Sequence, residues 1–366
     1  MSEKISRYAM IGALVALILA LGGMGYTYVA LTGLASDVNS MKADIDTLVG
    51  LTAPEGLELL RAAKKEGMLT VYHVMSADYM ARFMMEFSLK YPWMKVEYIR
   101  GGTYPMTEKV TAEMSAGKLQ CDVFSVNDVN VFADFKKKGW LMKYDSPQYE
   151  KYPGYPASDP GYWFAVRAFT YPLVYNTKYV KTPPTSWKDM LKPEYKGKVI
   201  IVDPRVAGDA LDFYWAMRKL YGIEFWETMG KQQVSIEYQG TARIEKLSTG
   251  EAWIGQHADF QYLDFKAKGA PVQGIWPAEG TCFTPNPQGI LAKAPHPNCA
   301  KLFMEWCMSD EGQSFVVQQM TTISVKKGMP SPAGLPSGIK FIEIDRDDLA
   351  ANRDTLLKEF EKLMGL

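Results

Sequence analysis

The longest uncharged stretch of the chain runs from Tyr8 to Ser36, close to the N-terminus. Its first half is almost wholly apolar, and about 20 apolar residues are enough to span a bilayer. Basic residues precede the stretch and acidic residues follow it, namely Lys4, Arg7, Asp37, Asp44 and Asp46. By the positive-inside rule this pattern favours a cytosolic N-terminus. We therefore expect a cytosolic segment at 1–7, a transmembrane anchor at 8–34, and a large body on the far side of the membrane.

A cleavable secretory signal is the alternative, with Gly33-Leu34-Ala35 as a small-residue cleavage site. The apolar run is longer than the roughly 7–15 residues usual in a signal peptide, which favours a retained anchor. No cysteine lies near residues 20–40, so a lipid-anchored precursor is not expected. In either case the body is exported. We expect a single-pass protein of the cell membrane with its body on the extracellular or periplasmic side.

Composition excludes some classes of partner. The chain has 41 basic and 41 acidic residues, so its formal net charge is zero and nothing in its charge favours nucleic acid. About 310 residues follow the anchor, enough for two lobes.

Four cysteines do not form a disulfide framework. Cys299 and Cys307 are expected on one helix about 12 Å apart, too far to bridge. Cys121 and Cys282 would pair only if the fold joined them, and buried free thiols are the favoured state.

Helix and strand patterns alternate along the body. Apolar residues at three- and four-residue steps predict an amphipathic stalk helix within 35–54, and a second helix is expected at 55–66. Beyond it the patterns predict strands at 68–72, 95–99, 121–126, 163–175 and 198–202, and helices at 77–90, 106–116, 127–138, 211–220 and 243–247. This alternation predicts an α/β protein whose mainly parallel sheet is covered on both faces.

Small and polar residues follow several of these strands, where ligands bind in open α/β sheets. Glycines there let backbone N–H groups approach an anion at a helix N-terminus. Each loop alone is more often an ordinary turn, but five in this context favour a cleft. The candidate ligand-binding residues in these loops are His73, Ser76, Gly102, Thr103, Ser125, Asn127, Gly208, Asp209, Gly240 and Thr241. Arg205 and Asp209 also fit a role as plain loop charges.

Arg167 is the favoured cation of the cleft, because it lies among apolar residues on a predicted strand, where an unpaired charge is costly. Its planar guanidinium holds a carboxylate, phosphate or sulfonate with two hydrogen bonds. The competing interpretation, given equal weight, is an ion pair with an internal aspartate. Four aromatic residues would wall a pocket or stack on an organic ligand, although aromatic residues at such positions more often belong to the core. They are Tyr72, Trp163, Tyr238 and Phe260.

If their segment were extended, the side chains of His257 and Asp259 would lie on the same face and would offer a pair of metal ligands. A hydrogen-bonded histidine beside a solvated aspartate is the commoner arrangement. No HExxH, CxxC or calcium-loop spacing is present, so neither a metal site nor a cofactor is expected.

Several segments together resemble the extracellular solute-binding proteins of ABC importers, in the group that includes ferric-iron, thiamine, polyamine and phosphonate receptors. The resemblance covers about residues 55–360, and it is carried by the segments Val174–Thr177, Pro183–Lys198, Asp203–Arg205, Ser248–Ala252, Lys266–Val272, Ala294–Phe303 and Ser309–Gln313.

The resemblance implies a two-lobed periplasmic-binding-protein fold of type II that closes on a solute by a hinge. Lobe 1 would comprise 55–165 and 276–366, and lobe 2 would comprise 166–275. The hinge would lie in the strand at 163–175 and in the return near 274–280. The implied partners are a small solute and an ABC permease.

The resemblance also bears on the ligand. Ferric-binding members carry an adjacent tyrosine pair shortly before the segment that begins at Lys266, and the matching residues are Phe260 and Gln261. Tyr262 lies one position on, so a one-residue shift would supply one phenolate. Ferric iron prefers anionic oxygen ligands, so this departure disfavours direct Fe³⁺ binding.

We therefore favour a small anionic solute, such as a phosphonate, sulfonate or carboxylate, bound by Arg167 and by backbone N–H groups near Gly208 and Gly240. A ferric or other metal–anion complex is second, and a cationic solute such as thiamine or a polyamine is third, with Asp128, Asp203 and Asp259 as its carboxylates.

Two other classes need consideration. An extracellular hydrolase would use His73 with Ser76, or His257 with Asp259, but the sequence supplies no third orienting group for either pair. The chain has no GxSxG, P-loop or GxGxxG motif. A purely adhesive protein would need no hinged cleft. We expect a binding protein and not an enzyme.

Overall fold

The computed structural model describes residues 53–366. The predictions for 1–7 and 8–34, and nearly all of the predicted stalk at 35–54, lie outside these residues. No helix within the described part of the chain is long and apolar enough to cross a membrane.

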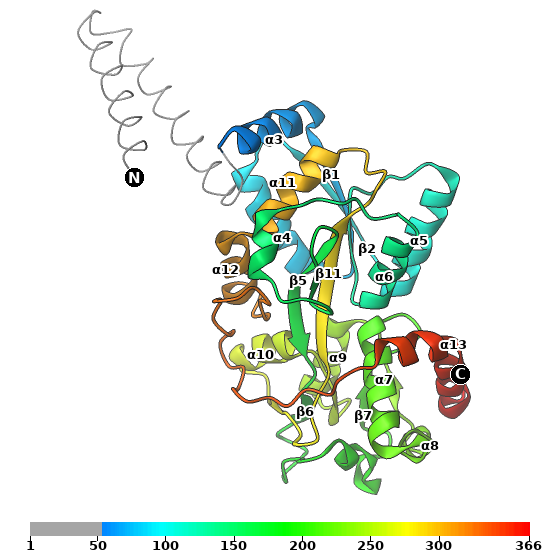
Figure 1. The fold of residues 1–366 in the computed structure, drawn as a ribbon. Coiled ribbons are helices and arrows are strands. Elements are labelled where there is room, and N and C mark those ends of the chain that lie inside the picture. Colours follow the sequence, from blue (N-terminus) through cyan, green and yellow to red (C-terminus); the bar gives the residue numbers. More distant parts are fainter. Residues whose placement is uncertain (1–52) are drawn as a thin grey trace, which may run out of the picture. The chain divides into compact units, whose positions relative to one another are not determined.

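Two mixed β-sheets organise the described residues (Figure 1). The first has the order β2-β1-β3-β11-β5-β4. Its strands are β1 (Met68–His73), β2 (Lys95–Arg100), β3 (Val123–Ser125), β4 (Ser158–Asp159), β5 (Trp163–Thr170) and β11 (Phe283–Ile290). The helices that accompany it are α3 (Ala53–Glu66), α4 (Ala77–Lys90), α5 (Thr103–Ala116), α6 (Val129–Lys137), α11 (Pro297–Met308) and α12 (Asp310–Gln318), with a 3₁₀ turn η1 (Pro147–Lys151). We call this part lobe 1.

The second sheet has the order β10-β6-β9-β7-β8. Its strands are β6 (Leu173–Asn176), β7 (Val199–Ile201), β8 (Ser235–Ile236), β9 (Ile254–Gln256) and β10 (Val272–Ile275). Around it lie α7 (Gly208–Tyr221), α8 (Ile223–Lys231), α9 (Gly240–Thr249), α10 (Asp259–Ala267), η2 (Trp187–Leu191) and η3 (Pro193–Tyr195). We call this part lobe 2.

The prediction of a mainly parallel sheet was wrong. The pairs β1–β2, β1–β3, β7–β8 and β7–β9 are parallel, but β11 runs antiparallel to both β3 and β5. In lobe 2, β6 runs antiparallel to β9 and β10. The antiparallel members include the strands on either side of the first two crossings between the lobes, and β4 also runs antiparallel to β5. The chain passes out through β5 and returns through β11, so these neighbours run in opposite directions.

The single strand predicted at 163–175 is two strands. β5 ends at Thr170 in the first sheet, and β6 begins at Leu173 in the second. Between them stands Pro172, which has no N–H group to donate to a sheet ladder. Residues 166–170 therefore belong to the first sheet, whereas the prediction assigned them to lobe 2.

The C-terminal helix α13 (Arg346–Met364) also differs from the prediction, which assigned 276–366 to lobe 1. It packs against α7 and α8 of lobe 2, beside which it is drawn in red in Figure 1. A buried ion pair of Arg346 with Asp212 holds its first turn, and Tyr214 and Arg218 bond to Glu359 near its end. These contacts join segments more than 130 residues apart. The periodicity within a single segment cannot predict such contacts.

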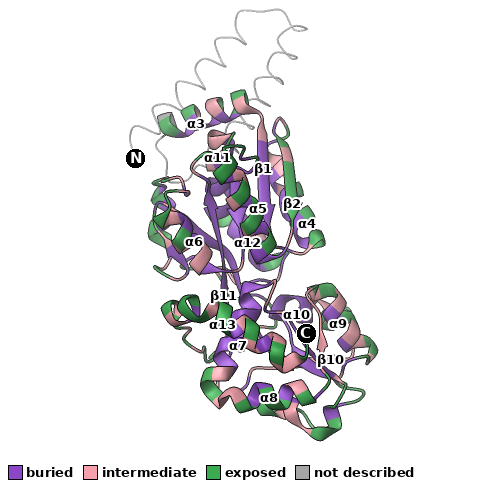
Figure 2. Ribbon diagram, turned by 90° about the vertical axis from the view of Figure 1, so that its right-hand side faces the viewer, coloured by how far each residue is buried: buried purple, intermediate pink, exposed green. Residues whose placement is uncertain are grey.

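Each lobe has its own apolar core, and the strands of both sheets are mostly buried while the outward helix faces are exposed (Figure 2). In lobe 1, α4 and α11 contribute Phe87, Phe303 and Trp306, whose rings lie 4.9–6.2 Å apart. Burying each such side chain contributes about 1.5–3 kcal/mol. The four cysteines are free and buried, as predicted.

Candidate ligand-binding site

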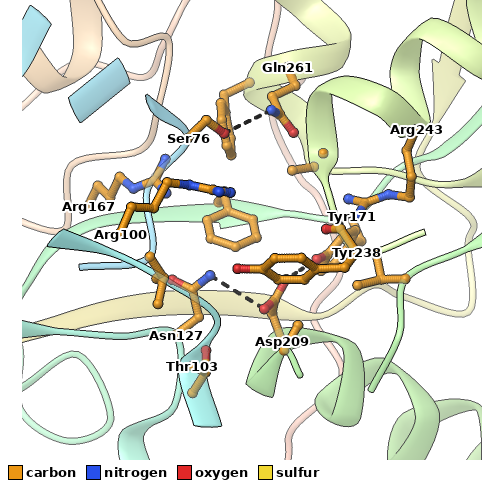
Figure 3. A pocket seen from close by; sticks show the side chains of 17 residues that line it. Ser76, Arg100, Thr103, Asn127, Arg167, Tyr171, Asp209, Tyr238, Arg243 and Gln261 are labelled. Carbon is orange, nitrogen blue, oxygen red and sulfur yellow. Dashed lines mark hydrogen bonds between the residues drawn. The ribbon is translucent and has the colours of Figure 1, made fainter. Parts of the chain in front are cut away.

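A cavity of about 60 Å³ lies between the two lobes. Both lobes and the crossing between them line it (Figure 3). The lining residues are Val74, Ser76, Arg100, Thr103, Asn127, Arg167, Phe169, Tyr171, Val202, Ala207, Asp209, Tyr238, Gly240, Arg243, Ala258, Phe260 and Gln261.

Helix N-termini gather around this cavity. Within residues 53–366, six helices have their N-cap, the residue before it, or one of their first residues in the cavity wall. They are α4, α5, α6, α7, α9 and α10. The first N–H groups of a helix have no partner within the helix, and the helix dipole places partial positive charge there. The arrangement therefore favours an anion.

Arg167 extends from β5 into the cavity and is 2% exposed. Its Nε donates to Asn286 Oδ1 at 3.3 Å, and its guanidinium carbon lies 4.7 Å from the centre of the Phe260 ring. Its Nη1 has no hydrogen-bond partner among the described residues. Burial lowers the pKa of Arg167 to about 10, so the side chain is still charged at neutral pH.

Arg243 comes from the first turns of α9 on the opposite side of the cavity (Figure 3). It is 3% exposed, and its Nη1 donates to the carbonyl oxygens of Glu237 and Tyr238. Its Nε has no partner among the described residues. Burial lowers its pKa from the usual value. A buried N–H without a partner is costly, so both arginines retain capacity for a ligand.

Arg100 ends β2 and is the third arginine of the wall. Its Nε donates to the Met75 carbonyl oxygen at 2.9 Å, and its guanidinium carbon lies 5.9 Å from the Tyr238 ring of lobe 2. Among residues 53–366, no carboxylate forms an ion pair with Arg100, Arg167 or Arg243. The predicted alternative of an ion pair between Arg167 and an internal aspartate is therefore not found in this part of the chain.

Asp209 is the one carboxylate among the described residues that line the cavity. It lies in the first turn of α7 and is 6% exposed. The Tyr171 hydroxyl donates to its Oδ2, and Asn127 Nδ2 lies 3.4 Å from its Oδ1. The wall therefore carries three positive charges against one negative charge.

Phe260 and Gln261, at the positions of the family's tyrosine pair, both line the cavity. Phe260 lies beneath Arg167, and Gln261 Nε2 donates to Ser76 Oγ at 3.1 Å, from lobe 2 to lobe 1. Two residues that cannot supply a phenolate thus line the cavity at these positions.

Seven of the predicted ligand-binding residues line the cavity, namely Ser76, Thr103, Asn127, Arg167, Asp209, Gly240 and Phe260. Eight do not, namely His73, Gly102, Ser125, Gly208, Thr241, His257, Asp259 and Tyr262. Thr241 lines a second cavity of about 450 Å³, which adjoins the first and shares Ser76, Arg100, Gly240 and Gln261 with it. We call this second cavity the outer cavity.

Most of the other seven are held in the protein interior. Ser125 accepts a hydrogen bond from Asn286, and Tyr262 is 1% exposed in the core of lobe 2. His73 is fully buried, and neither ring nitrogen has a partner among the described residues. Burial, with Arg100 and Arg167 nearby, lowers its pKa to about 3. Gly102 and Gly208 lie where the lobes approach each other too closely for a side chain.

His257 and Asp259 do not act as the pair that an extended segment would give. Asp259 begins α10, and its Oδ2 accepts bonds from the backbone and hydroxyl of Thr170. The His257 ring contacts the carbonyl oxygens of Gly240 and Ala258 instead. Burial raises the pKa of Asp259 to about 7 and lowers that of His257 to about 3.

The other carboxylates considered in the sequence lie outside the cavity wall, and the other aromatic residues are divided between the wall and the core. Asp128 caps α6, and Asp203 pairs with Arg205 at 2.7 Å. Arg205 is thus a loop charge as predicted, whereas Asp209 lines the cavity. Tyr238 lines the cavity, whereas Tyr72 and Trp163 belong to the core of lobe 1. No group of three or more metal-ligating side chains occurs among residues 53–366.

Sequence reasoning missed Arg100, Arg243 and Tyr171, and it treated Gln261 only as a substituted tyrosine. A signal existed for the two arginines. Arg100 immediately precedes Gly101 and Gly102, which mark a loop at the end of a strand, and Arg243 follows Gly240 by three residues. A positive charge in the first turns of a helix opposes the helix dipole, and such local conflicts often mark function.

A family model of bacterial extracellular solute-binding proteins matches residues 121–352, more than half of the chain. The chain belongs to this family. Its members bind solutes outside the cytoplasm, so this chain is a periplasmic or extracellular binding protein, and the predicted resemblance is confirmed.

Relatives and solved structures agree with this assignment. An uncharacterised protein of Haemophilus influenzae is 26% identical over 313 residues, which are 81% of this chain and 90% of that protein. The periplasmic binding protein AfuA of Actinobacillus pleuropneumoniae, solved with fructose-6-phosphate, has a TM-score of 0.73 at 23% identity and covers 82% of this chain and 99% of its own. Iron-bound HitA of Pseudomonas aeruginosa has a TM-score of 0.69 at 22% identity, covering 80% and 99%. These structures confirm the periplasmic-binding-protein fold.

Proposed function

We propose that this protein is the receptor of an ABC importer and that it captures a small anionic solute between its lobes. One observation carries the choice of an anion. Arg100, Arg167 and Arg243 surround a cavity at which six helices begin, and no carboxylate among the described residues pairs with any of the three. A bound oxyanion would accept the free N–H groups of Arg167 and Arg243 in charge-assisted hydrogen bonds.

The size of the cavity favours a compact charged group. Its volume of about 60 Å³ is far below the roughly 300–1,000 Å³ of sites for larger organic ligands. The outer cavity of about 450 Å³ has room for the rest of an organic anion. The fructose-6-phosphate of AfuA, a similarly folded protein, is an anion of this kind.

The cavity is a poor site for a cationic solute or a bare ferric ion. Three arginines repel either cation, and Asp128, Asp203 and Asp259 lie outside the wall. Two phenols, Tyr171 and Tyr238, do line it, but burial raises the pKa of both and opposes the phenolate that Fe³⁺ prefers. We therefore do not propose iron, the metal bound in the HitA structure, as the solute of this chain.

Transport follows from closure of the lobes and transfer to a permease. The chain crosses between the sheets at 171–172 and at 276–282, which we propose as the hinge. The anchor at 8–34 remains a proposal, and a tethered receptor would gain effective concentration at its permease. The function needs no chemical step, and neither predicted acid–base pair forms at the cavity. We therefore propose a binding protein and not an enzyme.

The test is calorimetric titration of the full chain, freed of bound solute by unfolding and refolding. The solutes are phosphate, methylphosphonate, sulfate, acetate, Fe³⁺ with and without citrate, thiamine and spermidine. We expect binding of at least one free anion, and a loss of about 30-fold or more in Arg167→Met, because a desolvated charged hydrogen bond is worth about 2–5 kcal/mol. Arg61→Met, an exposed arginine on α3, is the matched control and should bind normally.

Binding of thiamine, spermidine or Fe³⁺ without any response to a free anion would overturn the proposal. Equal affinities of Arg167→Met and the parent protein for the anion would also overturn it, because the cavity would then not be the binding site.

A further inference from the structure

Asp209 is out of place in a site for an anion. Its carboxylate lines the cavity at 6% exposure, where two negative charges in close contact repel each other strongly. Burying a charged group that has no counter-ion is costly as well. A side chain kept there against both costs needs a reason.

The charge of Asp209 raises the pKa of Arg167 and Arg243 from a distance, but Asp209 does not contact either guanidinium directly. Asp209 lies in no ion pair within 4.0 Å of Arg100, Arg167 or Arg243 in the described part of the chain. Its partners are instead neutral hydrogen-bond donors, the Tyr171 hydroxyl and the Asn127 amide (Figure 3). The carboxylate is oriented from both sides, by Asn127 of lobe 1 and by Tyr171 between the lobes.

Asp209 also keeps acceptor capacity. Two carboxylate oxygens offer about four lone-pair sites, and the two neutral donors use two of them. What remains faces a cavity whose other charged groups, Arg100, Arg167 and Arg243, can only donate. A ligand that fits this wall must accept hydrogen bonds from the arginines and donate one to Asp209.

We propose that Asp209 selects oxyanions that carry their own hydrogen-bond donor, above all the protonated forms of phosphates and phosphonates. Fully ionised sulfates, sulfonates and carboxylates have only acceptors and meet Asp209 oxygen to oxygen. This inference rests on the proposed function and narrows its ligand class. A buried acceptor left without its donor lowers affinity by about tenfold to a hundredfold, and that is the discrimination we expect.

The sharpest probes are methylphosphonate and methanesulfonate, which have nearly the same shape. Near neutral pH the phosphonate retains a proton on a fraction of its molecules, and the sulfonate retains none. In calorimetric titration of the full chain at pH 7, we expect methylphosphonate to bind at least tenfold more tightly. Its affinity should fall as the pH rises through its second pKa, while that of methanesulfonate should stay level.

Two variants distinguish selection through a hydrogen bond to Asp209 from a general effect of its negative charge. Asp209→Asn keeps the shape and an acceptor for Tyr171, but its amide can donate to an ionised oxygen. We expect methanesulfonate affinity to rise at least tenfold and the preference for methylphosphonate to disappear. Asp203→Asn removes a negative charge from the loop that leads into the same helix but lies outside the cavity wall. It should leave the ratio of the two affinities unchanged.

The donor could also belong to another part of the solute. We therefore add 2-hydroxyethanesulfonate, whose hydroxyl is its only donor. Binding of this compound tenfold more tightly than methanesulfonate would support the inference and place the donor on the organic part.

Equal binding of methylphosphonate and methanesulfonate by the parent protein, with a level pH profile, would overturn the inference and leave the proposed anion receptor standing. Failure of every anion to bind would overturn the proposed function and the inference with it. If Asp209→Asn did not fold, the pH profile of the parent protein would still decide.

Discussion

Single residues of the cavity contradict local rules, and these contradictions carry functional information. Arg243 occupies the first turns of α9, where the helix dipole disfavours a cation, and Asp209 lines a wall of arginines. Arg167 lies at 2% exposure with an unpartnered nitrogen. Each costs free energy in the empty protein, which a bound anion with a donor group would recover.

Burial also has a free-energy cost for the histidines, and this cost appears in their lowered pKa values. His257 contacts two carbonyl oxygens, which favour its charged form, but burial and the nearby Arg243 outweigh them and lower its pKa to about 3 from 6.5. The folded protein therefore holds fewer protons at this site than the unfolded chain. The stability that this group contributes is complete above pH 6.5 and is lost as the pH falls toward 3.

We predict that His257→Gln makes the stability of the protein less sensitive to acid. Below pH 6.5 the parent protein loses about 1.4 kcal/mol per pH unit through this group. Between neutral pH and about pH 5 the variant should thus lose about 2 kcal/mol less than the parent. Urea unfolding at both pH values measures this difference, and equal losses would contradict it.

At the scale of elements, helix ends and ion pairs decide where the site lies. Helices from both lobes point their N-termini at one cavity, because each follows a strand whose carboxyl end lies at the cleft. The C-terminal helix α13 is secured to lobe 2 by Arg346, which is 9% exposed and bonded to Asp212 through two nitrogens. This buried ion pair fixes α13, the last helix of the chain, to lobe 2.

We predict that Arg346→Met destabilises the protein by about 3–5 kcal/mol near pH 8, because it leaves Asp212 buried without a partner. Burial raises the pKa of Asp212 to about 6 even though Arg346 lowers it, so removing Arg346 should raise that pKa further. The loss should therefore shrink as the pH falls toward 6 and stay level below it, where the carboxyl is protonated in both proteins. Lys138→Met breaks an exposed ion pair with Asp134 and should cost less than about 1 kcal/mol.

Urea unfolding at two pH values measures both variants. If Arg346→Met cost no more than the exposed control, α13 would not depend on this ion pair.

At the scale of the whole molecule, the two lobes approach each other through glycines. A Cβ atom at Gly208 would lie 2.7 Å from the Asn127 carbonyl oxygen, and one at Gly102 would lie 2.8 Å from the Val206 carbonyl oxygen. Each of these contacts joins lobe 1 to lobe 2. The structure is thus in a closed arrangement that glycine permits.

We predict that Gly208→Ala hinders closure without weakening the fold. Alanine is the better helix former by up to about 1 kcal/mol, so thermal stability without ligand should be unchanged or higher. Anion affinity should fall about tenfold or more, and small-angle scattering should show a larger radius of gyration with ligand than for the parent protein. Gly154→Ala, where a Cβ meets no atom within 4 Å, is the control. Unchanged affinity in Gly208→Ala would mean that closure tolerates a side chain there.

Periodicity and turn chemistry alone predicted much of the molecule. The helix at 77–90 was predicted with the observed bounds, and most of the other elements for which bounds were predicted agreed to within a few residues. These features depend on contacts within a few positions along the chain. Five lining residues, Ser76, Thr103, Asn127, Asp209 and Gly240, were predicted because the carboxyl ends of strands meet at one edge. The predicted ligand class rested on Arg167 and on backbone N–H groups near Gly208 and Gly240.

Tertiary structure decided the rest. The antiparallel strands next to the crossings, the place of α13 and the grouping of Arg100 with Arg243 depend on contacts between distant segments, up to 167 residues apart for Val123 and Ile290. Likewise, Asp209 reads in the sequence as a loop charge, and only folding places it beside Tyr171 and Asn127. Local patterns report which face of an element is buried. Which charges meet there, and whether each finds a partner, is set by how distant elements pack.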